Sequence, residues 1–82
     1  MSTQNTSELF IGIDVSKDLL NLYVHPTLEQ KLFSNNGKGI GELVDFARSL
    51  NPFLIVLEAT EGYEMAVMSV LTANQQPVVV AK

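Results

Sequence analysis

The stretch FIGIDVSKDLLNLYV, residues 10–24, decides how the fold begins. Residues 9–15 are a continuous apolar run with Ile or Val at every second position from Ile11, which is typical of a central strand buried on both faces. The polar break SKD separates this run from a second strand over LLNLYVH, and three residues is a hairpin length. The carboxylate of Asp14 stands where the first strand should end. Burying it would be costly unless a turn, a cation or a metal ion compensates the charge.

The rest of the chain alternates between the periods of strands and helices. EQKLFSN predicts a third, more polar strand near an edge of the sheet, and FLIVLEA predicts a second buried strand that closes on Glu58. PVVVAK predicts a last strand after Pro77. A helix is predicted over residues 35–50, where a turn rich in glycine leads into an apolar stripe at helical spacing. The stripe consists of Ile40, Leu43, Val44, Ala47 and Leu50.

A second helix is predicted over residues 63–74, with Thr60 as its cap. Its stripe consists of Tyr63, Val67, Val70 and Leu71. The element order is therefore β-β-β-α-β-α-β, an α/β fold with a mixed sheet. An antiparallel meander is followed by strands that add in parallel through right-handed crossovers. The sheet stops after its fifth strand, so we expect a piece truncated from a longer protein.

Composition bounds the class of protein. The chain has 82 residues, 46% of them apolar, which is enough for one small domain over residues 9–82. Residues 1–8 lack the basic and apolar regions of a signal peptide and predict a disordered polar tail. There is no cysteine for a disulfide or a thiolate zinc site. No apolar run approaches the roughly 20 residues of a membrane helix, so we expect a soluble, cytoplasmic protein without a membrane partner.

Charge argues against strong nucleic-acid binding by this segment alone. Five Lys and Arg stand against nine Asp and Glu, giving a net charge of −4, and the cations are scattered along the sequence. A catalytic module that works through carboxylates, with its basic surface on other sequence, remains open.

Asp14 and Glu58 each end an apolar strand, and sites in open α/β sheets gather at the carboxyl ends of strands. If the two strands are parallel neighbours, the carboxylates lie side by side and repel each other unless a divalent cation lies between them. Such hard oxygen ligands suit Mg²⁺ or Mn²⁺, which serve in attack on phosphodiesters. The alternative is that Asp14 is a turn residue and Glu58 a charge at a helix N-terminus.

The motifs GIDVSKDLLNLYV and VLEATEGYE resemble the N-terminal domain of the IS110-family transposases, whose DEDD catalytic domain is similar to the RuvC Holliday-junction resolvase. The resemblance covers about residues 9–82 and implies an RNase H-like fold. It implies that Asp14 and Glu58 are the first two catalytic acids and ligands of Mg²⁺ or Mn²⁺. The family's remaining acids, a closely spaced Asp pair, and its catalytic serine lie beyond this chain. One departure is Glu61, which stands where the family commonly has glycine, and we interpret it as a solvated charge.

The resemblance also implies the activity and the partners. Enzymes of this family cleave and exchange DNA strands when an insertion sequence transposes, and members use an RNA encoded by the element to choose sites. We therefore expect a bacterial DNA transposase that binds DNA and a guide RNA and forms a homo-oligomer at full length. The fragment alone should be inactive, and its incomplete ligand set should bind metal weakly or not at all.

Two rival functions and several weaker candidate residues remain. Actin-like and sugar-kinase ATPase lobes also open with a strand ending in Asp, but the turn after Asp14 lacks their phosphate-binding glycines. A non-catalytic assembly module would fit the missing basic face and the unfinished edge strand. We interpret Ser16 as a turn hydroxyl, Lys17 as a surface charge and His25 as a turn residue. Tyr63 is predicted to pack in the first turn of its helix.

Overall fold

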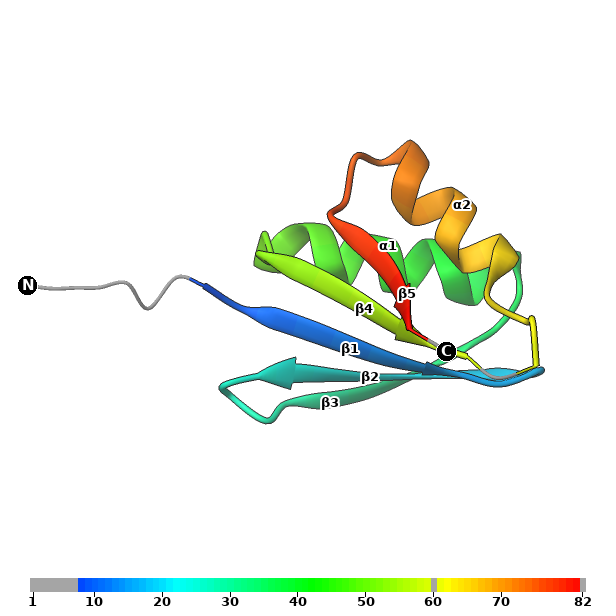
Figure 1. Ribbon diagram of the computed structural model, residues 1–82, viewed down its shortest axis with the longest axis horizontal. Coiled ribbons are helices and arrows are strands. Elements are labelled where there is room, and N and C mark those ends of the chain that lie inside the picture. The colour runs from blue at the N-terminus through cyan, green and yellow to red at the C-terminus, as the bar shows by residue number, and fades with distance from the viewer. Residues whose placement is uncertain (1–7, 60, 82) are drawn as a thin grey trace, which may run out of the picture.

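The computed structural model of the protein describes residues 8–59 and 61–81, and its secondary-structure elements follow the predicted order (Figure 1). They are β1 (Phe10–Val15), β2 (Leu19–His25), β3 (Gln30–Ser34), α1 (Gly37–Leu50), β4 (Leu54–Glu58), α2 (Met65–Ala73) and β5 (Val78–Ala81). The predicted tail falls outside the described residues except for Glu8, which is exposed. No helix in the described part of the chain is long and apolar enough to span a membrane.

The strands form one mixed sheet in the order β3-β2-β1-β4-β5. β1, β2 and β3 pair as an antiparallel meander, and β4 then pairs with β1 in parallel. β5 adds to the outer side of β4, again in parallel. The predicted mixed sheet is confirmed, and its topology places the ends of β1 and β4 side by side although 44 positions separate residues 14 and 58 in the chain.

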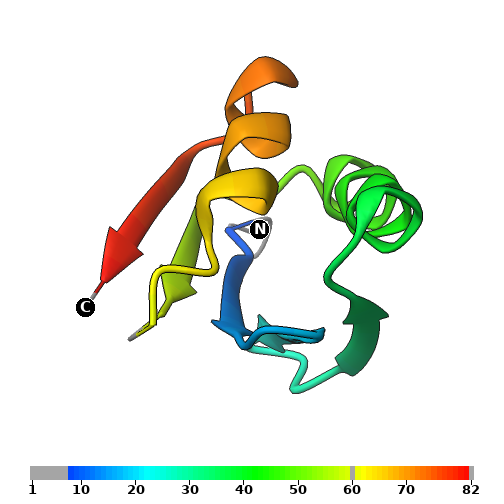
Figure 2. The same cartoon turned by 90° about the vertical axis from the view of Figure 1, so that its right-hand side faces the viewer.

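Both helices cover the same face of the sheet (Figure 2). The core lies between this face and the helices, because alternate residues of each inner strand point toward it. Its fully buried members include Ile11, Ile13, Leu20, Leu22, Leu43, Ile55, Leu57 and Leu71. The prediction that β1 is buried on both faces is wrong for this chain: Phe10 and Asp14, on the opposite face, are exposed. No helix among the described residues covers that face, so the apolar run of residues 9–15 predicted more burial than the structure shows.

Local capping explains where α1 begins and ends. The side chain of Asn36 accepts a hydrogen bond of 2.8 Å from the backbone N–H of Gly39, which satisfies one donor of the first turn. At the other end Asn51 adopts the left-handed conformation (φ 50°, ψ 59°), and Pro52 follows. The predicted stripe of α1 is buried apart from Leu50, which is half-buried.

The start of α2 corrects the sequence prediction. The helix begins at Met65, and Glu64 is its N-cap residue without a side-chain cap hydrogen bond. Thr60, the predicted cap, lies outside the described residues. Tyr63 precedes the helix in a turn and is 42% exposed, so its predicted packing role is wrong. The earlier start was predicted because Tyr63 lies at helical spacing before Val67. In the structure, the buried residues of α2 are Val67 and Leu71.

Candidate functional site

Asp14 and Glu58 are register partners at the carboxyl ends of β1 and β4. Neighbouring strands lie about 4.8 Å apart, so the two backbones are adjacent at this point. The predicted juxtaposition of the two carboxylates is confirmed by this register. Their role as metal ligands stays a prediction.

Strand alternation aims both side chains at the same face of the sheet. Ile13 and Leu57, each one residue earlier, are buried against the helices. Successive side chains of a strand point to opposite faces, so Asp14 and Glu58 lie on the face that the helices do not cover. Both residues are exposed, which means that water solvates their charges in this chain and that no buried partner is required.

The neighbours of the pair along the sheet are a polar residue on one side and a small one on the other. Asn21 of β2 is the register partner of Asp14, and Ala81 of β5 is the register partner of Glu58. The Asn21 side chain is held in place on both sides: its Nδ2 donates to the Tyr23 hydroxyl at 3.3 Å, and its Oδ1 accepts from Gln30 Nε2 at 3.0 Å. The pair therefore lies beside a fixed amide and an open, small-residue edge.

The electrostatics at this end of the sheet are negative. The ion pair between Arg48 and Asp45, at 4.0 Å, is the one that the structure records among residues 8–59 and 61–81. Asp14 and Glu58 thus have no cationic side chain as a partner within those residues. Glu61 is exposed nearby in sequence and adds a further negative charge.

Two adjacent carboxylates fit a divalent cation as part of a ligand set. Mg²⁺ and Mn²⁺ prefer hard oxygen donors and are often held by one or two carboxylates. No group of three or more His, Cys, Asp or Glu side chains that could hold a metal ion occurs within the described ranges. Asp14 and Glu58 can therefore supply two ligands, and a cation held there would need further oxygens.

Other candidate residues are placed away from such chemistry. Ser16 Oγ donates to the carbonyl of Leu19 at 3.1 Å and accepts from the backbone N–H of Leu19 at 3.2 Å, so the hydroxyl closes the β1–β2 turn as predicted. Lys17 is exposed in the same turn. His25 pairs with Phe10 at the opposite end of β1 and is therefore remote from Asp14.

One residue of this region was missed by the sequence analysis. Asn35, between β3 and α1, donates from its side-chain amide to the carbonyls of Ser16 at 2.8 Å and Tyr63 at 3.2 Å. These acceptors lie 19 and 28 positions away in the chain. An asparagine in a loop carries no sequence signal that would identify such distant partners.

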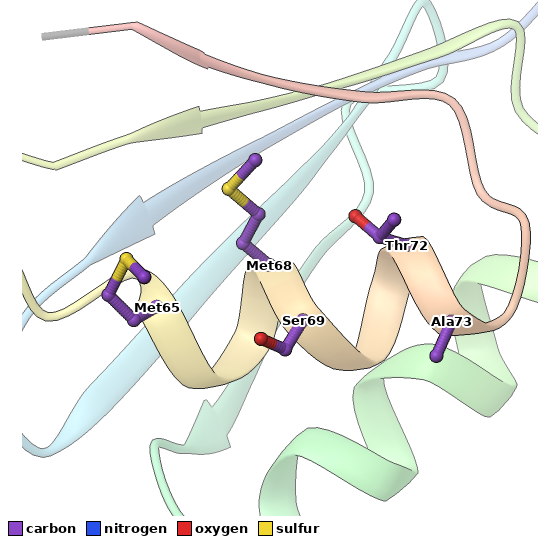
Figure 3. A pocket seen from close by; sticks show the side chains of 5 residues that line it. All are labelled: Met65, Met68, Ser69, Thr72 and Ala73. Carbon is purple, nitrogen blue, oxygen red and sulfur yellow. The ribbon is translucent and has the colours of Figure 1, made fainter.

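A shallow groove lies on α2, and its lining residues carry no catalytic group. It is lined by Met65, Met68, Ser69, Thr72 and Ala73, which form one stripe along the helix (Figure 3). The groove belongs to the helix layer, on the other side of the sheet from the carboxylate pair. Its lining contains no charged side chain, so it offers neither an acid–base group nor a metal ligand.

No protein-family model and no curated protein sequence matches the chain. Among solved structures it is similar to T. thermophilus RuvC in complex with a Holliday junction substrate, with a TM-score of 0.68 at 13% sequence identity. The likeness covers 90% of this chain and 64% of that one, so the chain spans less than two thirds of the length of its structural neighbour. At this identity the comparison establishes the fold, which is the RNase H-like fold of RuvC.

Proposed function

We propose that the chain is the N-terminal part of a catalytic domain of the IS110-transposase type, which cleaves and exchanges DNA strands. In this proposal, Asp14 and Glu58 are the first two catalytic acids of that domain and ligands of Mg²⁺ or Mn²⁺. The observation that carries this proposal is their register: two carboxylates, remote in sequence, end adjacent parallel strands on one exposed face. The RuvC-like fold and the two motifs around these residues support it independently.

The chemistry assigned to the chain is that of a ligand platform. Asp14 and Glu58 would hold a divalent cation, which when bound would supply polarisation of a scissile phosphate and neutralisation of its charge. The strand ends fix where the carboxylates of Asp14 and Glu58 stand, and the sheet gives them a rigid base. The missing ligands are the two further acids that the family resemblance implies, which lie outside residues 1–82.

The negative charge of this segment suggests that it supplies metal ligands and that other parts of the protein supply the contacts to DNA. The net charge of −4 makes the segment a poor DNA binder by itself, because phosphate contacts need Lys and Arg. We infer that the basic contacts to DNA and to a guide RNA come from other parts of the protein, which acts in the bacterial cytoplasm as a homo-oligomer. The isolated segment is accordingly inactive.

The test uses the protein at its natural full length, with Asp14→Asn and Glu58→Gln as the variants. Each replacement keeps the shape of the side chain and removes a charged metal ligand. We expect both variants to fold, to bind nucleic acid and to lose Mg²⁺-dependent strand cleavage. The matched control is Glu42→Gln, an exposed carboxylate on α1, which should leave cleavage unchanged. Undiminished cleavage and exchange by both site variants would refute the proposal.

A further inference from the structure

The side chain of Asn35 joins the two loops that leave the carboxylate pair. Its amide group donates to the carbonyl of Ser16, in the turn after β1, and to the carbonyl of Tyr63, in the connection from β4 to α2. The backbone N–H of Asn35 also donates to the carbonyl of Asp18, at 2.8 Å, on the other side of the β1–β2 turn. A single residue therefore contacts both loops through well-formed hydrogen bonds.

These contacts lie where the sheet no longer holds β1 and β4 together. The pairing of β1 with β4 ends at Asp14 and Glu58, which are its last register partners. After these two residues the backbone segments separate, one entering the β1–β2 turn and the other leading to α2. The hydrogen bonds of Asn35 connect the two segments again, at Ser16 and Tyr63.

The geometry points to Asn35 as a positioning residue that holds together the two loops leaving Asp14 and Glu58, and thereby supports the ability of the pair to bind one divalent cation together. This inference rests on the proposed function, in which the pair holds a cation. Asn35 touches neither the cation nor a substrate in this role. It acts by holding the backbone that follows each ligand.

The chemistry of the amide explains why asparagine suits this position. The side-chain NH₂ group has two N–H bonds, and each meets one of the two carbonyls. Aspartate has the same shape but offers only acceptors when ionised, so it would place an oxygen against both carbonyls. Alanine would leave both carbonyls without this donor and add no charge near the site, which makes Asn35→Ala the cleaner variant.

The neighbouring asparagine provides a matched control. Asn36 caps α1 through Gly39 and makes no hydrogen bond to the described residues of either loop, so Asn36→Ala removes a hydrogen bond at the same junction. We expect this control to lower stability while it leaves the loops in place. Comparing the two alanine variants separates positioning from simple destabilisation.

The first measurement follows backbone amide resonances of the metal-free chain by NMR. The amides of Lys17 and Glu64 directly follow the two accepting carbonyls and report on their hydrogen bonds. We expect Asn35→Ala to shift both resonances and Asn36→Ala to shift mainly the first turn of α1. Shifts that reach only one loop, or neither, would overturn the bridging role.

The second measurement is a titration of the full-length protein, which supplies the remaining ligands, with Mn²⁺, followed by paramagnetic broadening at Asp14 and Glu58. A net hydrogen bond typically contributes about 2- to 10-fold to an equilibrium constant, and Asn35→Ala removes two of them, so we expect this variant to weaken binding by about 10-fold. Asn36→Ala should bind as the wild type does. Equal affinity of the wild type and Asn35→Ala would overturn the positioning role while the metal pair stands.

A different result would identify failure of the proposed function itself. If the wild-type protein at full length, with its remaining ligands, shows no Mn²⁺ broadening at Asp14 and Glu58, the metal pair fails, and a role in positioning it fails too. In that case the Asp14→Asn variant would match the wild type throughout the titration.

Discussion

Replacing Gly39 with alanine tests how closely α1 is held against the end of β3. A Cβ atom at this position would overlap the carbonyl oxygen of Ser34 and would lie 2.7 and 2.8 Å from the carbonyl carbon and the backbone nitrogen of that residue. All three are backbone atoms, so no rotamer change can relieve the overlap. The helix or the strand end must move.

The size of the effect follows from a comparison with a second glycine of the same helix. Gly41 has open space around its Cβ position, so Gly41→Ala should stabilise the protein by about 1 kcal/mol through helix propensity. Gly39→Ala should instead cost about 1–3 kcal/mol, the usual range for overpacking. The two variants should therefore differ by about 2–4 kcal/mol, which corresponds to at least about 8 °C in Tm for a domain of this size.

Thermal unfolding followed by circular dichroism measures this difference directly. The amide resonance of Asn35 adds a local probe, because this residue lies between Ser34 and the helix. We expect Gly39→Ala to lower Tm and to shift this resonance. A Gly39→Ala protein as stable as Gly41→Ala would show that the helix has room at its first turn, and the close packing deduced from the structure would be wrong.

Two further predictions concern the core and the end of α1. Ile13→Ala, at a fully buried position beside Asp14, should cost about 2–5 kcal/mol in chemical denaturation, and a cost below about 1 kcal/mol would contradict the packing of β1 against the helices. Asn51→Ala should lose about 1 kcal/mol because a Cβ-bearing residue without a polar side chain tolerates φ 50° poorly, whereas Asn51→Gly should stay close to the wild type in the same assay. Equal losses for both Asn51 variants would show that the conformation is not the cause.

The order of elements could be predicted from the sequence because each one has a strong local signal. The strand over Leu19–His25 was predicted with its observed bounds, since a polar turn precedes it and Pro26 follows it. The start of α2 was missed because its apolar period extends into a turn that no local rule separates from the helix. The burial of β1 was overestimated because an apolar run indicates a strand with two apolar faces. It does not indicate whether helices of the same chain cover both faces.

The carboxylate pair could be predicted on one condition, that the strands ending in Asp14 and Glu58 are parallel neighbours, and the register meets this condition. Asn35 could not, since its partners are carbonyl groups of two distant loops and any residue supplies a carbonyl. Only the folded arrangement brings Ser16 and Tyr63 within reach of one amide. Positioning contacts of this kind depend on backbone geometry and leave no pattern of residue types in the sequence.

The exposure of the carboxylate pair bears on when a cation becomes necessary. Two unit charges 4 Å apart repel by about 1 kcal/mol in bulk water and by about 4 kcal/mol at the effective dielectric constant of a partly desolvated protein site. The chain can therefore fold with Asp14 and Glu58 side by side in water, because the solvated pair costs little. In the proposed function, a DNA phosphate brought to this face would displace water and add a third negative charge. The repulsive energy between the two carboxylates and the phosphate would then rise severalfold. A divalent cation between them would make the total electrostatic energy attractive. If Asp14 and Glu58 act as proposed, the same strand-end geometry that is nearly neutral for stability in the free chain would make cation binding depend on the approach of DNA.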